Sequence, residues 1–431
     1  MDTNSNSNYN HKSYRFFLVR QGIEAFLFSL AWTVQAIYFI LNAHLDPLQL
    51  VLVGTVLEVS CFLFEIPTGI VADVYSRRLS VLIGFALWGA GFLIEGAFPF
   101  FWVILLSQVV MALGFTFNSG ALEAWIAGEV GEENLGRTFL RASQVGRVSA
   151  LAAMLTAIAF GLLNIDPAVP IIIAGVGFLG LALYGVPTMP ETGFTRKPKE
   201  ERNGWRDMAA TFKDGTRVVR ASPVLLIFMA LTLFAGASTE GMDRLWEAHF
   251  LQNFTFPGGV SLQPIVWFGL MNIGLLVLGV LGTRILEKRV DTNNRDVVAR
   301  VVIAFNVLEI ASLVWFALAG DFATALLAFW GMNLFRGIVG PLFRTWLTQS
   351  IEPRVRATVL SMVGQSDAIG QMAVGPVIGW IGTAGSIRAA LMFSAVLLAP
   401  VVPLVALARS RVVVKPPEPA VLPEASIALS D

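Results

Sequence analysis

The sequence is poor in the residues on which most enzymes depend. A single cysteine, Cys61, excludes an internal disulfide framework and a cysteine-rich metal site. The three histidines, His11, His44 and His249, are scattered, and the chain has no nucleophile–base spacing, phosphate-binding loop or metal-ligand cluster. We therefore expect no enzymatic activity, no bound metal and no organic cofactor.

Charged residues are also scarce. Only 14% of the 431 residues are charged, 55% are hydrophobic, and the mean hydropathy is +0.69. A soluble domain carries about a quarter charged residues, so this composition excludes a soluble globular protein and indicates a lipid bilayer as a partner. The thirty basic residues balance the thirty acidic ones, and no nucleic-acid partner is expected.

The sequence consists mainly of long apolar runs. A bilayer core about 30 Å thick requires about twenty helical residues, and twelve runs of about that length follow one another. They cover residues 16–41, 48–72, 79–98, 101–125, 138–163, 168–188, 223–250, 261–284, 298–319, 322–347, 356–382 and 387–409. We predict an all-α integral membrane protein with twelve transmembrane helices in two pseudo-symmetric six-helix halves.

The longest interior loop separates these halves. The predicted parts are a disordered cytoplasmic N-terminus at 1–15, the first half at 16–188, a linker at 189–222, the second half at 223–409 and a cytoplasmic tail at 410–431. Within the linker, Trp205, Met208, Phe212 and Val219 fall on one helical face, which predicts an amphipathic helix on the membrane surface. A flexible linker is the alternative.

Lysine and arginine gather in the loops on one side of the predicted membrane. Residues 77–78, 284–289 and 409–415 are among these basic clusters, whereas the opposite loops carry only Arg388. Because basic loops remain in the cytoplasm, we expect both termini to be cytoplasmic, in a multi-pass protein of the plasma (inner) membrane.

The two halves resemble each other in sequence. Residues 120–125 read Gly-Ala-Leu-Glu-Ala-Trp, and residues 340–346, about 220 positions later, read Gly-Pro-Leu-Phe-Arg-Thr-Trp. Related halves with a binding site at their interface are typical of secondary transporters.

The strongest local motif is a charged hairpin at residues 65–78. It reads Glu-Ile-Pro-Thr-Gly-Ile-Val-Ala-Asp-Val-Tyr-Ser-Arg-Arg. This resembles the loop signature of the major facilitator superfamily, Gly-x-x-x-Asp-Arg-x-Gly-Arg-Arg/Lys, with Val74 and Ser76 in place of its Arg and Gly. The preceding Glu-Ile-Pro-Thr-Gly is similar to the wording of drug-exporter-like members. The resemblance implies a twelve-helix transporter of that kind.

The same resemblance implies that Gly69, Asp73, Arg77 and Arg78 form a gating motif. Asp73 can accept hydrogen bonds at the positively polarised start of the helix predicted at 356–382, and the two arginines can bond to a carboxylate or a helix C-terminus of their own half. We expect Asp73→Asn to reduce transport while folding and membrane insertion stay largely intact. Wild-type transport by this variant in proteoliposomes would contradict the gating role.

Ionisable residues within the apolar runs are the candidates for function. A charge at membrane depth costs a few kcal/mol or more, so each one implies a partner, a cavity or a function. A matched pair is either a structural ion pair between two helices or a proton or substrate site. Similar depths along the helices predict three pairs: Glu24 with Arg147, Glu123 with Arg141, and Arg336 with Asp367.

The predicted substrate and proton pathway draws on these charges. Glu58 and Glu65 lie seven residues apart, on one helical face, and burial among apolar groups favours the protonated form of a carboxylate, so both are candidate proton carriers. In the superfamily, helices 1, 4, 7 and 10 line the cavity. The candidate pathway residues are Glu24, Glu58, Glu65, Asn118, Glu123, Arg147, Glu240, Asp243, Arg336 and Asp367.

These features favour proton-coupled efflux of small amphipathic compounds by alternating access, with the proton gradient as driving force and the monomer as working unit. The carboxylates suit proton coupling, and the apolar, aromatic interior suits a hydrophobic substrate. Two alternatives remain open. Arginines at membrane depth would suit uptake or exchange of an organic anion, and the altered loop signature would suit a non-transporting membrane sensor.

Overall fold

The computed structural model describes residues 10–193, 219, 222–257, 262–351 and 356–412, without the side chains of Ile66, Asp73 and Ala357. Every regular element in these residues is a helix. The amphipathic helix predicted between Trp205 and Val219 lies outside the described residues.

Six membrane-crossing segments form the first half. They are α1 (His11–Ile37) continued by the π-helical turn η1 (Tyr38–Asn42), α2 (Pro47–Val74), α3 (Arg77–Ala97), α4 (Phe101–Asn118) followed by α5 (Ala121–Val130), α6 (Glu132–Leu162) and α7 (Ala168–Thr188). The turns between α1 and α2 and between α3 and α4 are short, as the sequence predicts.

Six further segments form the second half. They are α9 (Pro223–Asn253), α10 (Pro264–Arg289), α11 (Arg295–Leu318), α12 (Phe322–Gln349), α13 (Arg356–Ala384), and α14 (Ile387–Leu398) followed by α15 (Val401–Val412). Eleven stretches among the described residues are long and apolar enough to cross a membrane. The twelfth segment, α13, is more polar because Gln365, Asp367 and Gln371 interrupt its apolar sequence. The predicted all-α membrane fold is confirmed.

Local sequence fixes where the helices begin. Asp46 and Gln49 form a reciprocal capping box at the start of α2, and Pro47 occupies the first helical turn, where its missing N–H costs nothing. Ser76 caps α3 by accepting from the Leu79 amide. At α12, hydrogen bonds from the Thr324 amide and hydroxyl hold the pKa of Asp321 below its ordinary value.

The first helix begins earlier than predicted. The sequence suggested a disordered segment through residue 15, but α1 starts at His11, because the Asn10 side chain accepts from the backbone N–H groups of Lys12 and Ser13. The predicted boundary was therefore wrong by about one helical turn. At the other end, α15 continues to Val412, slightly past the predicted boundary at 409.

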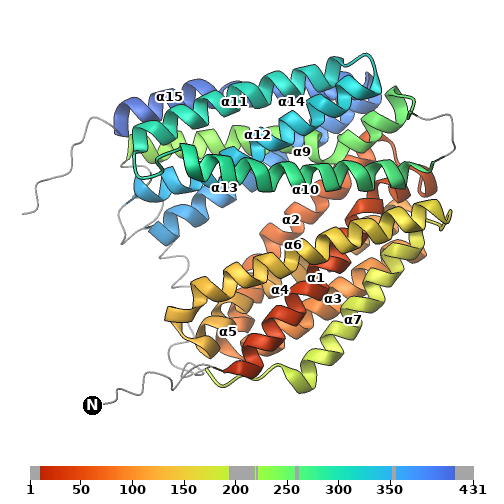
Figure 1. Ribbon diagram of the computed structural model, residues 1–431, viewed down its shortest axis with the longest axis vertical. Helices are drawn as coiled ribbons and strands as arrows, with labels where there is room; N and C mark the ends of the chain where they lie inside the picture. Colours follow the sequence, from red (N-terminus) through yellow and green to blue (C-terminus); the bar gives the residue numbers. More distant parts are fainter. Residues whose placement is uncertain (1–9, 194–218, 220–221, 258–261, 352–355, 413–431) are drawn as a thin grey trace, which may run out of the picture.

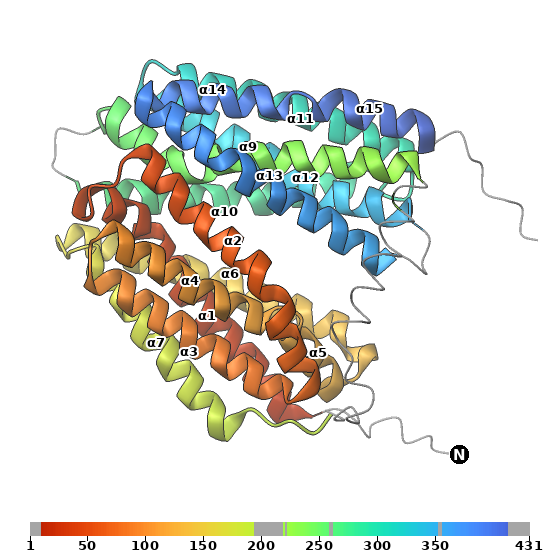
Figure 2. The same ribbon diagram turned by 180° about the vertical axis from the view of Figure 1, so that it is seen from behind.

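The two halves converge at one end and diverge at the other. Figures 1 and 2 show the first half, red to yellow, and the second half, green to blue, meeting away from the chain termini and separating on the side where the described chain begins and ends. The contacts across the junction pair α2 with α13 and α6 with α10. We call the junction of these four helices the closed end.

Small residues allow the backbones to meet at the closed end. A Cβ atom at Gly379 of α13 would lie 2.9 Å from the Leu48 Cα of α2, and one at Gly269 of α10 would lie 2.5 Å from Ile158 of α6. On the α13 side, the Thr383 hydroxyl accepts from the Leu48 amide at 2.9 Å. Close approach through glycine is a common way for helices to associate in membranes.

Candidate functional site

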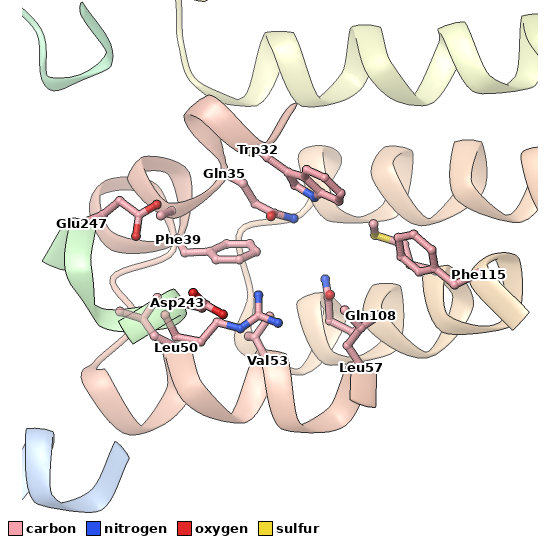
Figure 3. Close-up of a pocket in the computed structure, with 13 residues that line it drawn as sticks. Trp32, Gln35, Phe39, Leu50, Val53, Leu57, Gln108, Phe115, Asp243 and Glu247 are labelled. Atoms are coloured by element: carbon pink, nitrogen blue, oxygen red, sulfur yellow. The ribbon is translucent and has the colours of Figure 1, made fainter. Parts of the chain in front are cut away.

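A cavity of about 220 Å³ lies between the halves, next to the closed end. Its walls combine aromatic rings, amides and charges, and Figure 3 shows Gln35 and Gln108 entering from different helices, with the Phe39 ring beside them. The lining residues used below are Trp32, Gln35 and Phe39 of the first segment, Gln108 and Phe115 of α4, and Asp243, Arg244 and Glu247 of α9.

One ion pair joins α9 to α12 beside this cavity. Arg336 donates from Nη1 and Nη2 to the two carboxylate oxygens of Asp243, at 2.5 and 2.8 Å. Both side chains keep partial exposure, 32% for Arg336 and 48% for Asp243. Asp243 lines the cavity described above, whereas Arg336 lines a second cavity of about 520 Å³ on α12, so the pair lies where the two cavities approach each other.

This pairing corrects the prediction that Arg336 binds Asp367. Asp367 instead accepts from Gln371, one turn further along α13, at 2.8 Å. Matching depths fixed the position of each charge along its helix but not the direction in which its side chain points. The forked guanidinium of Arg336 meets Asp243 because α9 presents it at the right angle for a bidentate bond.

The other two predicted ion pairs are also wrong. Glu24 pairs with Arg20, one turn earlier on α1, at 2.5 Å, and Arg20 is 2% exposed. Arg147 is exposed on α6 and forms no ion pair within the described chain. Glu123 and Arg141 are both exposed and do not pair with each other. Glu24 is satisfied by a partner one turn away on its own helix, and the exposed residues need no partner on another helix.

Glu58 and Glu65 share a face of α2 but have different surroundings. Glu65 accepts a hydrogen bond from the Ser119 hydroxyl at 2.8 Å, at the break between α4 and α5, where Gly120 adopts a φ of 67°. Glu58 is half-buried, interacts electrostatically with Arg244, and forms no ion pair within the described chain.

Asn118 is turned away from the cavity. Its amide donates to the Gly114 carbonyl at 3.0 Å and packs against Gly84 of α3, where an added Cβ would lie only 1.9 Å from the Asn118 nitrogen. This places Asn118 in the packing of α3 on α4, and it lines neither cavity.

Glu240 and Arg244 of α9 lie against the first half. Glu240 is buried, and its Oε2 atom is 3.6 Å from the Arg244 Nε atom, an ion pair without a hydrogen bond. A Cβ atom at Gly54 of α2 would lie 2.3 Å from that nitrogen. Gly54 therefore makes room for a charge pair of the second half at the interface.

Sequence reasoning missed Glu95 of α3, which is fully buried. It accepts from Gln35 at 2.7 Å and from Gln108 at 2.8 Å, both of which line the cavity. The available signal was that Glu95 is the one acidic residue in the apolar run at 79–98. Glu247, a carboxylate that lines the cavity, was likewise absent from the predicted pathway.

The two arginines of the hairpin hold the first half together. Arg77 donates to the Ala124 carbonyl of α5 at 2.8 Å. The Arg78 guanidinium donates to the Val186 carbonyl near the end of α7, and its backbone N–H donates to Glu191 at 2.9 Å. The Arg78 bond to a carbonyl near the C-terminus of α7 is of the expected kind, whereas Glu191 is bound through the Arg78 backbone and not through its guanidinium; the gating role remains a prediction.

The remaining hairpin positions lie where the halves diverge. No described atom comes within 4 Å of a Cβ built on Gly69. Ser76, which replaces the glycine of the family signature, donates to Glu191 at 2.7 Å in addition to capping α3. The side chain of Asp73 lies outside the described part of the chain, so its predicted bond to the start of α13 is not tested.

Comparison with known proteins decides the family. The family model for the Major Facilitator Superfamily matches residues 21–299, more than half of the chain. The chain belongs to this superfamily. An uncharacterized MFS-type transporter, YxaM of Bacillus subtilis (strain 168), is 25% identical over 394 residues, covering 89% of this chain and 92% of YxaM.

Solved structures of superfamily transporters share the fold. A bacterial homolog of the human lysosomal transporter Spinster, in an inward-facing and unoccupied conformation, matches with a TM-score of 0.75 at 16% identity over 95% of this chain and 100% of that one. The nucleoside transporter NupG matches with a TM-score of 0.70 at 13% identity over 94% and 99%. The peptide transporter POT in complex with sulfate matches with 0.71 at 15% over 93% and 95%. These likenesses show that the chain shares the fold, and its membership of the superfamily makes it a secondary transporter.

This superfamily member also has a buried hydrogen-bond cluster around Glu129, at the diverging end of its first half. Glu129 of α5 accepts from Asn10 and Ser13, which precede and begin α1, at 2.9 and 2.8 Å. Its carboxylate also accepts from the Thr192 hydroxyl and amide and from the Gly193 amide, beyond α7. One carboxylate thereby fastens both ends of the half.

We expect Glu129→Ala to release these two ends. Hydrogen bonds to a charged acceptor are worth about 1.5–3 kcal/mol each, so loss of even one corresponds to at least about tenfold more frequent opening. Limited proteolysis of the purified protein should show correspondingly faster cleavage near residues 10–13 and 190–193. Glu133→Ala, an exposed glutamate nearby, is the control, and equal cleavage rates for both variants would contradict this role of Glu129.

Proposed function

We propose that the protein is a proton-coupled exporter of small amphipathic compounds that works by alternating access. The substrate would bind in the cavity between the halves, in contact with Trp32, Phe39 and Phe115. Aromatic walls with a few polar groups are typical of sites for such molecules. The closed end would part while the diverging end closes, as the halves rock about the site.

The observation that carries this proposal is the excess of carboxylates around the cavity. Asp243 is paired with Arg336 and Glu240 with Arg244, which leaves Glu58 and Glu247 without an ion-pair partner within the described chain. Unpaired carboxylates beside a membrane cavity are stabilised by taking up either protons or a cationic group of a substrate. Competition between the two would couple export to proton entry.

The other predicted pathway residues take supporting places in this proposal. Glu24 would stay with Arg20 as a structural pair, Glu65 would respond to movement at the α4–α5 break, and Asp367 would face the second half's side of the pathway. Exposed Glu123 and Arg147 would contribute to the path towards the diverging end.

A proteoliposome assay tests the proposal. We would use ethidium, an aromatic cation carrying amino groups, as the probe and a lumenal pH dye as the proton readout. Proton movement opposite to ethidium is expected, and Glu247→Gln should reduce the coupled flux while Glu287→Gln, an exposed glutamate of α10, should not. Ethidium flux that is indifferent to the pH gradient would exclude proton coupling.

Organic-anion exchange is the second candidate, and a specific observation favours it. Arg336 and Arg344, together with Asn333, line the larger cavity on α12. Arginine forks suit carboxylate and phosphate groups. Exchange of a labelled dicarboxylate, with no ethidium flux, would favour this reading, and no flux of either probe would favour the non-transporting sensor.

We further propose that the protein is a monomer without catalytic activity, in the plasma (inner) membrane with both termini in the cytoplasm. The basic loops support that orientation. In it, the diverging end would face the cytoplasm. Protease accessibility of a tag after residue 431 in inside-out and right-side-out vesicles measures the orientation directly.

A further inference from the structure

Glu95 occupies a site that neither the pathway nor the hairpin motif uses. Its side chain is 0% exposed, yet no arginine or lysine of the described residues bonds to it. Its hydrogen-bond donors are neutral: Gln35 binds Oε1 at 2.7 Å, and Gln108 binds Oε2 at 2.8 Å with a longer contact from Ser107 at 3.4 Å. Burial disfavours the charged form of a carboxylate, whereas the two amide donors favour it, so neither form is locked in by an ion pair.

The two glutamines connect this buried group to the cavity. Both line the cavity, and both turn their amide nitrogens to Glu95. Neither amide oxygen accepts a hydrogen bond within the described chain, and neither is among the fully buried unpaired atoms. The oxygens are therefore the atoms that these amides present to the cavity.

We propose that Glu95 is a proton-binding site that controls the hydrogen-bonding character of the cavity wall through the Gln35 amide. This deepens the proposed function and rests on it for the direction of transport. Glu95 and Gln35 belong to α3 and α1, so the switch is built entirely within the first half.

Protonation of Glu95 changes one hydrogen-bond acceptor into a donor. A proton binds Oε1 of the ionised carboxylate, and that oxygen becomes a hydroxyl donor that needs an acceptor. Within the described chain, Gln35 is the only donor on Oε1, so its amide turns over and offers its oxygen, which moves its nitrogen to the cavity. The Oε2 side has less freedom, because the Ser107 hydroxyl is committed to the Ile104 carbonyl at 2.7 Å and Gln108 is buried.

The turn exchanges an acceptor for a donor at the cavity wall. With Glu95 ionised, the wall presents amide oxygens and favours substrates that carry N–H donors or a cationic amine. With Glu95 protonated, one N–H faces such a substrate and weakens its binding. Proton and substrate are then negatively coupled, as exchange of the two requires.

Few other titratable groups surround Glu95. The Tyr38 hydroxyl of η1 donates to the Glu95 backbone carbonyl at 2.7 Å, and Arg244 of α9 acts on the carboxylate only at longer range. From α4 the facing groups are the neutral Ser107 and Gln108, and from α7 the facing groups are aliphatic, around Gly96. Among the described residues, Glu95 is therefore the group at this site that can exchange a proton.

Infrared difference spectroscopy of the purified protein without substrate tests the site. A pH titration should show a protonated carboxyl band that is lost in Glu95→Gln and retained in Glu287→Gln, a change at an exposed glutamate outside the cavity. Gln35→Met keeps the carboxyl group and removes its donor, so the band should titrate at higher pH. If Glu95→Gln loses no protonated carboxyl band, or if the titration of that band is unchanged in Gln35→Met, the proposal is overturned.

Ethidium binding to the same protein tests the coupling. We expect affinity about tenfold weaker at pH 6 than at pH 8, a pH dependence that Glu95→Gln reduces and that Glu287→Gln, a change at an exposed glutamate outside the cavity, retains. Equal pH dependence in wild type and Glu95→Gln would overturn the coupling. Absence of ethidium binding at either pH would count against the proposed function for this probe, while the infrared band would still decide whether Glu95 takes up a proton.

Discussion

Gly379→Leu is expected to reduce transport at least tenfold and to shift the protein away from the arrangement described here. A Cβ at this position would lie 2.9 Å from the Leu48 Cα and 3.1 Å from the Val51 Cβ of α2, and the nearer atom belongs to the backbone. Overpacking of this kind costs about 1–3 kcal/mol. The cost falls only on states in which the closed end is closed, so it acts directly on the balance between conformations.

Spin-label distances across the closed end measure this shift. Cys61→Ser removes the only native thiol, and Phe100→Cys with Gly385→Cys places labels on exposed positions in the two halves. Gly379→Leu should lengthen the main distance or add a longer component. Gly364→Leu, on the same helix but with no described atom within 4 Å of its Cβ position, is the matched control. Identical distance distributions in both variants would contradict the interpretation of the closed end.

The second large effect is expected from Asp243→Asn. The change removes the carboxylate that binds both Arg336 guanidinium nitrogens and leaves a cation between two cavities without its partner. Truncating one member of a hydrogen-bonded charge pair costs about 2–5 kcal/mol when the pair is buried. Because Asp243 is 48% exposed, we expect the lower part of this range, and a loss of transport of about tenfold or more.

Exchanging the two charged residues distinguishes the effect of losing the ion pair from the effect of losing the aspartate side chain. The double variant Asp243→Arg with Arg336→Asp restores opposite charges on α9 and α12 and should recover part of the lost transport. Asp296→Asn, which alters a half-buried aspartate paired with Arg300 and Arg409 away from both cavities, should have little effect. If the double variant were no better than Asp243→Asn, the carboxylate would be needed for something other than this pair.

The sequence was sufficient to predict the helices because each one is a long apolar run. The turns at Phe98 and Gly320 were recognisable as breaks in that pattern, and the basic loops marked one side. The predicted start of α1 was about one helical turn too late. Asn10 caps the helix, and a helix cap is a polar signal that apolar runs do not contain.

The side-chain partners could not be predicted in the same way. Depth along a helix gives one coordinate of a charge, whereas pairing also depends on helix rotation and tilt. Glu24 therefore pairs with Arg20 and not with Arg147, and Arg336 pairs with Asp243 and not with Asp367. Glu95 was missed because its donors, Gln35 and Gln108, come from two other helices and carry no charge that would have drawn attention.

The hydrogen-bond cluster around Glu129 affects how a six-helix unit can be joined to other units. Asn10 and Gly193, which bracket the first half, bind the same carboxylate, so this six-helix unit begins and finishes at one point in space. A unit with coincident ends can be joined to a copy of itself through a single connecting segment without disturbing either copy. It can also be recombined, circularly permuted or exchanged as one cassette, with residues 10 and 193 as the natural cutting points.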